Sequence, residues 1–325
     1  MAIRVSQVKE AAGRVLIVAN PHAGAGAREA AVARLLRALD RRGLVAERVS
    51  DLDHAEALAA RDHAAGELLS VVAAGGDGTV AEIVNRTHPD VPITVYPLGT
   101  ANLLASYLRI SDDPDAFVQM LIDRATVRLD AASANGRVFL LMAGCGFDAE
   151  VVKRLHRQRV GRGISYWTYA RPILETIRDY EYPDLRVTVE SAADGAATTH
   201  SARWAFVVNL PCYAGGVQLA PTAVGTDGLL DLALFSNGSL WHGLRYLVFS
   251  LVGRQRVLKD FRSGCAARVR IESDRPVPYQ LDGDPGGMLP LEIHVLPGRM
   301  HLLAPAARVR ELAAPRAATA DAGAR

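Results

Sequence analysis

Hydrophobic residues in the first third of the chain alternate between short continuous runs and stretches with helical spacing. Residues 15–19 are an apolar run that stops at Asn20-Pro21, which is typical of a buried parallel strand. Residues 28–42 carry apolar side chains at helical spacing, and Gly43 ends the pattern. The same reasoning predicts strands at 45–50, 68–74 and 92–97 and helices at 55–65, 80–85 and from 103 onward. Such alternation predicts an open parallel sheet, in which ligands bind just outside the carboxyl ends of the strands.

The second half of the chain shows a different pattern, in which short strands are broken by Gly, Pro and Asp. The strands are expected at residues 138–143, 185–190, 204–209, 229–235, 268–272 and 291–296. Two helical insertions, at 149–180 and 239–252, interrupt them. This pattern predicts an antiparallel β-sandwich.

The predicted architecture is therefore an N-terminal α/β domain with an open parallel sheet, followed by an antiparallel β-sandwich domain. We place the boundary near Leu129, which gives domains at 1–129 and 130–299. The length of 325 residues agrees with two domains. The Ala-, Pro- and Arg-rich residues 313–325 are expected to be a disordered tail.

Composition excludes several classes of protein. The net charge is +2, from 37 basic and 35 acidic residues, which excludes a protein whose main feature is a polybasic arm that binds nucleic acid. Three widely separated cysteines argue against a disulfide framework and a Cys-rich zinc site, and a reducing, cytoplasmic setting fits best. No continuous apolar run is long enough for a transmembrane segment, and the N-terminal residues lack the apolar core of a signal peptide. None of the lysines follows a Gly-rich turn, which excludes a Walker-type phosphate loop.

Gly75-Gly-Asp-Gly-Thr79 is the most informative turn, because it follows a predicted strand and opens a predicted helix. Its glycines let the backbone approach a phosphate, and the helix N-terminus supplies unpaired N–H groups and a positive dipole. Asp77 would repel phosphate unless a divalent cation lies between them, and carboxylate oxygens suit Mg²⁺. The alternative is a tight structural turn in which Asp77 caps the helix.

Two more Gly-bearing turns fall at strand ends. The first is Asn20-Pro-His-Ala-Gly24-Ala-Gly26, and the second is Pro97-Leu-Gly-Thr-Ala-Asn102. Thr100 and Asn102 could donate hydrogen bonds to phosphate or ribose, or Thr100 could simply cap the following helix. The three turns together are far more specific than any one of them.

These three motifs, in this order, resemble the diacylglycerol kinase catalytic-domain family, which includes bacterial soluble lipid kinases and sphingosine kinases. The resemblance continues through Gly144-Cys-Gly-Phe-Asp-Ala-Glu150, Asp227-Gly-Leu-Leu-Asp231 and Leu281-Asp-Gly-Asp-Pro285. It implies a nucleotide-binding kinase domain, followed by a β-sandwich domain for the lipid substrate. It also implies that a final segment, at about 300–312, returns to the first domain.

The resemblance also implies site residues. The nucleotide is expected at Asn20, Gly24, Ser50, Gly75, Gly76, Asp77, Gly78, Thr79, Val80, Ala81, Thr100 and Asn102. Asp227 matches a Mg²⁺ ligand of the family, assisted by backbone carbonyls of Val224 and Leu229. Asp284 stands where bacterial members usually place a Glu that serves as general base. Asp284 and Asp77 are the expected catalytic residues, and Asp227-Gly228 could equally be a turn before a strand.

The function that the resemblance implies is ATP- and Mg²⁺-dependent transfer of the γ-phosphate to a lipid hydroxyl, diacylglycerol-like or sphingoid-like. Leu103 replaces an Asp found in several diacylglycerol-type members, which puts a strict diacylglycerol substrate in doubt. The alternatives are an NAD kinase-like enzyme, which shares Gly-Gly-Asp-Gly-Thr, and a regulator that has lost activity.

The expected partner is a lipid substrate at a membrane surface, reached by peripheral contact rather than by a transmembrane segment. A basic run at 153–162 lies beside Tyr166, Trp167 and Tyr169, and such a run suits an anionic membrane surface or a solvated helix face. The second insertion, at 239–252, is either a helix that covers the core or part of a lipid entry wall. The sequence leaves open whether the chain is a monomer or a homodimer.

Overall fold

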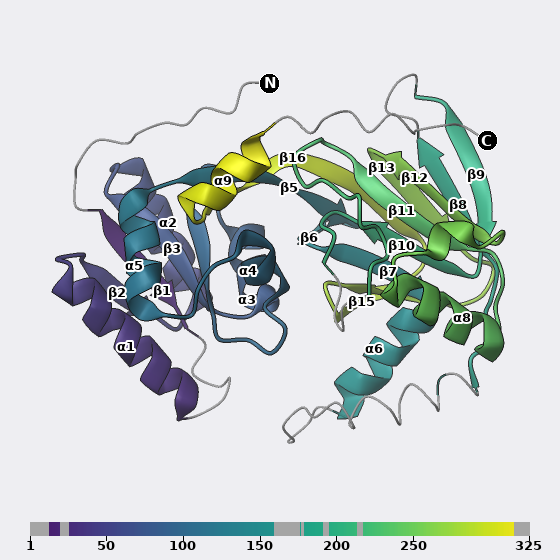
Figure 1. Cartoon of the computed structure of the whole chain (residues 1–325), viewed down its shortest axis with the longest axis horizontal. Coiled ribbons are helices and arrows are strands. Elements are labelled where there is room, and N and C mark those ends of the chain that lie inside the picture. The colour runs from purple at the N-terminus through teal and green to yellow at the C-terminus, as the bar shows by residue number, and fades with distance from the viewer. Residues whose placement is uncertain are drawn as a thin grey trace. The chain divides into compact units, whose positions relative to one another are not determined.

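The computed structural model describes residues 13–19, 26–158, 176, 179–190, 195–212 and 217–314. The chain forms two compact units, one of residues Met1–Arg128 with Met300–Arg325 and one of residues Leu129–Arg299. Figure 1 shows the elements of each unit.

The first unit is built on a parallel sheet in the order β2-β1-β3-β4-β16. Its strands are β1 (Arg14–Val18), β2 (Ala46–Val49), β3 (Leu68–Gly75), β4 (Ile93–Pro97) and the end of β16 (Leu291–Leu303). Its helices are α1 (Ala27–Arg41), α2 (Leu52–Ala64), α3 (Asp77–Arg86), α4 (Leu103–Leu108), α5 (Pro114–Asp123) and α9 (Ala306–Ala313).

Helices cover both faces of this sheet. The chain steps from β1 to β2 in one direction and from β2 through β3 to β4 in the other, so right-handed crossovers place α1 on one face and α2 and α3 on the opposite face. α1 packs beside α5, and α2 packs beside α3 (Figure 1). Because both faces are covered, β1 and β3 consist almost entirely of buried apolar residues.

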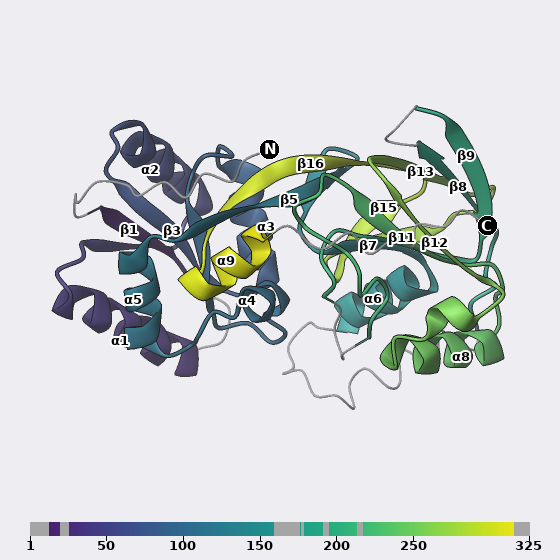
Figure 2. The same ribbon diagram turned by 45° about the horizontal axis from the view of Figure 1, so that its top comes forward.

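The second unit has two antiparallel layers. One contains β13 (Arg268–Glu272), β8 (Leu185–Glu190), β9 (Ala197–Ala202), β6 (Arg137–Phe139) and parts of β5 (Thr126–Ala134) and β16. The other has the order β12-β11-β10-β7-β14-β15. Its bounds are β12 (Phe261–Ala266), β11 (Leu230–Phe235), β10 (Trp204–Val208), β7 (Met142–Gly146), β14 (Pro278–Leu281) and β15 (Asp284–Met288). Figure 2 shows β16 running beside β5, the strand with which it pairs.

One hydrophobic core joins these two layers. It includes Val187 and Ile271 from the first layer and Val207, Leu232 and Leu281 from the second. Two helices, α6 (Phe147–Gln158) and α8 (Leu240–Leu251), belong to this unit, and α6 packs on β14 and β15. The α/β unit and the β-sandwich therefore confirm the predicted fold class.

Several predicted elements differ in detail from the structure. The strand expected at 138–143 is two strands, β6 and β7, and β9, β12 and the β14–β15 hairpin were not predicted. Most of the helical insertion expected at 149–180 beyond Gln158 lies outside the described residues, as does the expected tail after residue 314. Helix α9 includes Ala313, the first residue of that tail. Within the described residues, no helix is long and apolar enough to cross a membrane.

Candidate active site

Two of the three Gly-rich turns meet at the carboxyl ends of β3 and β4. Gly75 is paired with Pro97 in the parallel ladder, and the Leu98 amide donates to the Gly75 carbonyl at 3.0 Å. A Cβ added to Gly99 would lie 2.4 Å from the Cα of Gly76 and 3.0 Å from its nitrogen. Real Cβ atoms do not come within 2.4 Å of another carbon, so this close approach of the two backbones requires glycine at position 99, whereas a Cβ on Gly76 would lie a tight 3.2 Å from the Cα of Gly99.

Asp77 ties these two turns together. It is the first residue of α3, and its Oδ2 and Oδ1 accept hydrogen bonds from the backbone amides of Leu103 at 3.0 Å and Leu104 at 2.9 Å. The carboxylate thus satisfies two of the unpaired N–H groups at the start of α4. As a capping residue Asp77 therefore serves the neighbouring helix rather than its own, for which Gly76 is the N-cap.

The side chain of Asn102 is also used within its own turn. Its Oδ1 accepts from the Gly99 amide at 2.8 Å, and its Nδ2 donates to the Gly99 carbonyl at 2.9 Å. Asn102 itself takes a left-handed backbone conformation, with φ 49°, and α4 begins at the next residue. The expected alternative in which Thr100 caps this helix is wrong, because the N-cap position belongs to Asn102.

Polar groups without a described partner remain around the turns. The amides of Asp77 and Gly78 open α3, whereas the amides of Thr79 and Val80 bond back to the Gly76 carbonyl at 3.0 and 3.3 Å. In the described part of the chain, the hydroxyls of Ser50, Thr79 and Thr100 make no hydrogen bond, and Ser50 and Thr100 are exposed. Unpaired amides at a helix N-terminus together with hydroxyl groups form a suitable anion site.

The other residues that were predicted to bind the nucleotide differ in their exposure. Val80 is fully buried, so it can contribute only its backbone, whereas Ala81 is partly exposed. Asn20 and Gly24, in the third turn, lie outside the described residues.

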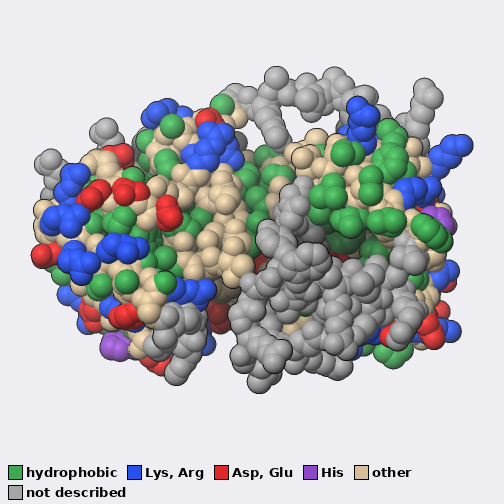
Figure 3. Space-filling model, turned by 60° about the horizontal axis from the view of Figure 1, so that its bottom comes forward, with side chains coloured by type: hydrophobic (Ala, Val, Ile, Leu, Met, Phe, Trp, Pro, Cys, Tyr) green, Lys and Arg blue, Asp and Glu red, His purple; other side chains and the backbone are tan. Residues whose placement is uncertain are grey.

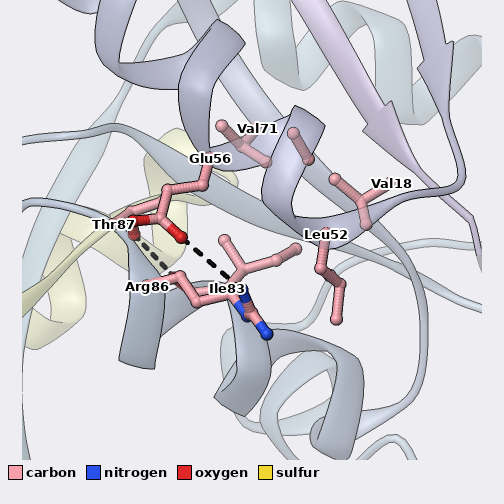
Figure 4. A pocket seen from close by; sticks show the side chains of 8 residues that line it. Val18, Leu52, Glu56, Val71, Ile83, Arg86 and Thr87 are labelled. Atoms are coloured by element: carbon pink, nitrogen blue, oxygen red, sulfur yellow. Dashed lines mark hydrogen bonds and ion pairs between the residues drawn. The ribbon is translucent and has the colours of Figure 1, made fainter.

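A small pocket lies between α2, α3 and the sheet (Figure 4). Its volume is about 10 Å³, room for about one water molecule, and its lining includes Val18, Leu52, Ile83 and Thr87. Arg86 closes one side and forms an ion pair with Glu56 at 3.5 Å. This pocket is too small for a nucleotide and contains none of the predicted site residues.

In the second unit, Asp227 lies in an exposed turn before β11. Its Oδ1 accepts from the Leu229 amide at 3.0 Å, and the Val224 carbonyl accepts from the amides of Thr226 at 2.8 Å and Asp227 at 3.4 Å. Asp130, which the sequence reasoning missed, supports this turn. Its buried carboxylate accepts from the amides of Gly228 at 2.8 Å and Gly298 at 2.7 Å. The signal for Asp130 was an acid set directly between the apolar residues Leu129 and Ala131.

The oxygen atoms around Asp227 suit Mg²⁺. One exposed carboxylate and the backbone carbonyls of Val224 and Leu229 are all hard oxygen donors, and Mg²⁺ commonly binds one or two carboxylates while keeping several waters. The described residues contain no group of three or more His, Cys, Asp or Glu side chains that could hold a metal. A site of this kind would therefore depend on water for most of its ligands.

Asp282 and Gly283 form a tight hairpin turn between β14 and β15, and Asp284 is the first residue of β15. Asp282 and Gly283 have φ values of 51° and 86°, the pair of positive angles found in a type I′ turn. Asp282 was not among the predicted residues, yet its carboxylate accepts three backbone hydrogen bonds, from Leu140 at 2.7 Å, Leu141 at 2.8 Å and Met142 at 3.0 Å.

Asp284 is different, although it lies only two residues away. Its carboxylate is partly exposed and makes no hydrogen bond or ion pair with any described residue. The turn is supported instead by Gln280, whose Oε1 accepts from the Gly283 amide at 2.7 Å. Of these two acids, Asp282 therefore has a structural role, and Asp284 is available for chemistry.

Two cations of the predicted basic run, Lys153 and Arg154, are paired with neighbouring acids. Lys153 and Arg154 pair with Glu150 at 3.3 and 3.2 Å, and Arg154 also reaches Asp179 at 3.6 Å. Glu150, which pairs with both cations, is only 16% exposed. The residues from Arg159 to Tyr169 lie outside the described residues.

Two family models match the chain, one in each half. The family model for the diacylglycerol kinase catalytic domain matches residues 14–134, and that for the YegS C-terminal NAD kinase beta sandwich-like domain matches residues 142–304. The chain belongs to the diacylglycerol kinase family. A diacylglycerol kinase of Bacillus subtilis is 27% identical over 92% of this chain and 99% of its own length. One of Mycobacterium tuberculosis is 28% identical over 90% of this chain and 96% of its own length.

Solved structures of this family share the fold. A diacylglycerol kinase from Bacillus anthracis superposes with a TM-score of 0.66 at 20% identity, covering 92% of this chain and 99% of that one. An NAD kinase from Archaeoglobus fulgidus, solved in complex with ATP, gives a TM-score of 0.50 at 14% identity, covering 92% of this chain and 96% of that one. At these identities the likeness concerns the fold alone.

Proposed function

We propose that this protein is an ATP-dependent lipid kinase that transfers the γ-phosphate to the hydroxyl of a diacylglycerol-like or sphingoid-like lipid. The observation that carries the proposal is the unpaired amides at the start of α3, which lie beside the close contact between the turns at Gly76 and Gly99. Membership of the diacylglycerol kinase family supports the lipid acceptor. The proposed setting is the cytoplasm, with peripheral contact to a membrane.

The nucleotide phosphates would lie at the N-terminus of α3. There the amides of Asp77 and Gly78 and the hydroxyl of Thr79 are available as donors, and the helix dipole favours negative charge. Thr100, in the turn after β4, and Ser50, directly after β2, are exposed polar residues that could contact ribose or phosphate. Because phosphoryl transfer requires little covalent help from the protein, positioning and electrostatic stabilisation account for most of its catalysis.

Asp284 is the proposed general base. As the lipid oxygen attacks the γ-phosphorus and the bond to the ADP oxygen breaks, its carboxylate accepts the hydroxyl proton. Asp227, with the carbonyls of Val224 and Leu229, would hold Mg²⁺, which supplies positive charge to offset the charge on the phosphates.

Asp77→Asn is expected to remove most of the kinase activity while the protein stays folded. The substitution removes a negative charge, and it replaces one acceptor oxygen by an NH₂ group that would face a backbone donor of Leu103 or Leu104. We expect a loss of about 1 kcal/mol in the free energy of unfolding, the typical size of a lost helix cap. Thermal denaturation and steady-state kinetics measure the two effects.

Glu82→Gln is the matched control for Asp77→Asn, because Glu82 is an exposed acid on the same helix. We expect this variant to behave as wild type. Near-normal turnover by Asp77→Asn at saturating ATP and Mg²⁺ would contradict a role for Asp77 in the phosphate site.

The function itself is tested by incubating the purified chain with ATP, Mg²⁺ and a total lipid extract. We expect ATP consumption that depends on the lipid, and a lipid product heavier by one phosphate in mass spectrometry. Formation of NADP from NAD under the same conditions would identify an NAD kinase-like enzyme. Binding of ATP or lipid without turnover would identify a regulator.

A further inference from the structure

Helix α8 exposes a stripe of large apolar side chains. The exposed fractions are 76% for Trp241, 50% for Leu244, 47% for Leu247, 51% for Val248 and 44% for Leu251. These residues recur at helical spacing and so share one side of the helix. Val252 and Val257, which follow the helix, are 62% and 66% exposed and extend the apolar area. Figure 3 shows it as a large green region on the right of the molecule.

The buried side of α8 holds the helix firmly in place. Tyr246 is 3% exposed, and its ring stacks on Phe235 with 4.3 Å between the ring centroids. Its hydroxyl donates to Asp260, which also pairs with Arg245. Burial, together with the neighbouring Asp260, raises the pKa of Tyr246.

The distribution of side chains on α8 is therefore the reverse of that on a helix that covers a core. Such a helix normally turns its large aliphatic residues inward. The inward side of α8 instead carries Tyr246, the buried Ser250 and Gly243, whose added Cβ would lie 3.0 Å from the Trp204 ring. Because the helix is fixed by these contacts, its aliphatic residues cannot turn inward, and a stripe of this size is typical of an interaction surface.

The charges around the stripe indicate the partner. Between Leu240 and Arg262 the only acid is Asp260, which is paired with Arg245. The other basic residues of this segment are all exposed: Arg254, Arg256, Lys259 and Arg262. An apolar stripe that contains Trp and is bordered by cations matches the chemistry of an anionic bilayer, in which apolar side chains enter the acyl boundary and basic residues stay at the headgroups.

We propose that α8 lies in the surface of an anionic membrane, with Trp241, Leu244 and Val248 inserted among the lipids. This inference deepens the proposed function, because a kinase acting on a lipid hydroxyl must reach a substrate held in a bilayer. It adds a membrane contact distinct from the basic run at 153–162, of which Lys153 and Arg154 are paired with acids.

The test is vesicle flotation of the full chain without ATP, using phosphatidylcholine vesicles with and without phosphatidylglycerol. We expect wild type to float with the anionic vesicles, and the triple variant Trp241→Ser/Leu244→Ser/Val248→Ser to bind them on the order of tenfold more weakly or worse. The matched control is Val45→Ser/Ile122→Ser, which removes exposed apolar residues of the other unit and should bind like wild type.

Fluorescence quenching gives a second measurement. Brominated lipids should quench Trp241 of the vesicle-bound protein, and Trp241→Phe should remove most of that quenching. Equal flotation of wild type and the triple variant would overturn the proposal. So would self-association in sedimentation that the triple variant abolishes, with no binding to vesicles, because the stripe would then be a contact between copies of the chain.

The activity assay separates this inference from the proposed function. With lipid dispersed in detergent micelles, the triple variant should turn over substrate like wild type, whereas on vesicles it should be slower. If wild type phosphorylates no lipid in either form, the proposed function fails, while flotation still decides the role of α8.

Discussion

Asp284→Asn is expected to lower the rate of phosphoryl transfer by about a hundredfold or more, since a positioned general base typically contributes about 10²–10⁴-fold. Nucleotide affinity should change little, because the base acts on the lipid hydroxyl and not on ATP. Asp284→Glu should retain or increase activity, since it restores the residue that members of the family usually carry at this position. Single-turnover kinetics with pre-bound ATP measure the transfer step directly.

The structure supplies a matched control two residues away. Asp282→Asn removes an acceptor oxygen from a carboxylate that accepts three hydrogen bonds from backbone amides. The Asp284 carboxylate accepts no hydrogen bond from the described residues. We therefore expect Asp282→Asn to lower thermal stability, and Asp284→Asn to leave it nearly unchanged. An active Asp284→Asn enzyme would rule out Asp284 as the proton acceptor and leave Asp77 as the remaining predicted catalytic acid.

Much of the fold could be predicted from the sequence because the parallel sheet is buried on both faces. Strands β1 and β3 are almost wholly apolar, and they end at Asn20-Pro21 and at Gly75-Gly76, so their positions follow from the sequence pattern alone. The β14–β15 hairpin was missed because β15 reads Asp-Pro-Gly-Gly-Met, a sequence with almost no strand propensity. It is a strand only because β14 pairs with it, which is tertiary information.

The site was predicted less completely, for a related reason. The motifs gave the correct loops, but they could not show what each polar side chain bonds to. Asp77 and Asn102 both looked like ligand-binding groups, and both make hydrogen bonds within the joined turns. Asp130 and Asp282 were missed because their carboxylates accept hydrogen bonds from the backbone amides of residues that are distant in sequence. An Asp whose carboxylate accepts hydrogen bonds from backbone amides cannot be told apart in a sequence from an Asp whose carboxylate is available for chemistry.

Gly99→Ala is expected to disrupt the nucleotide site, because it adds a methyl group where the two turns touch. The new Cβ would lie 2.4 Å from the Cα of Gly76 and 2.6 Å from Oδ1 of Asn102, so the turns after β3 and β4 must separate. Overpacking of this kind costs about 1–3 kcal/mol of stability. A displacement near 1 Å of the groups that hold the phosphates can lower the rate about a hundredfold. We therefore expect kcat/KM for ATP to fall by about that factor.

Gly264→Ala is the matched control, because an added Cβ there has no neighbour within 4 Å and the residue does not have a positive φ. It should bind ATP and turn over lipid like wild type, which would show that a methyl group on a glycine is not harmful in itself. Calorimetric titration with ATP separates the two effects of Gly99→Ala. If the folded variant binds ATP with wild-type affinity, the contact between the two turns is only structural, and the phosphate site does not depend on their spacing. If the ATP affinity falls in Gly99→Ala but is unchanged in Asp284→Asn, different residues are responsible for ATP binding and for proton transfer, as the mechanism requires.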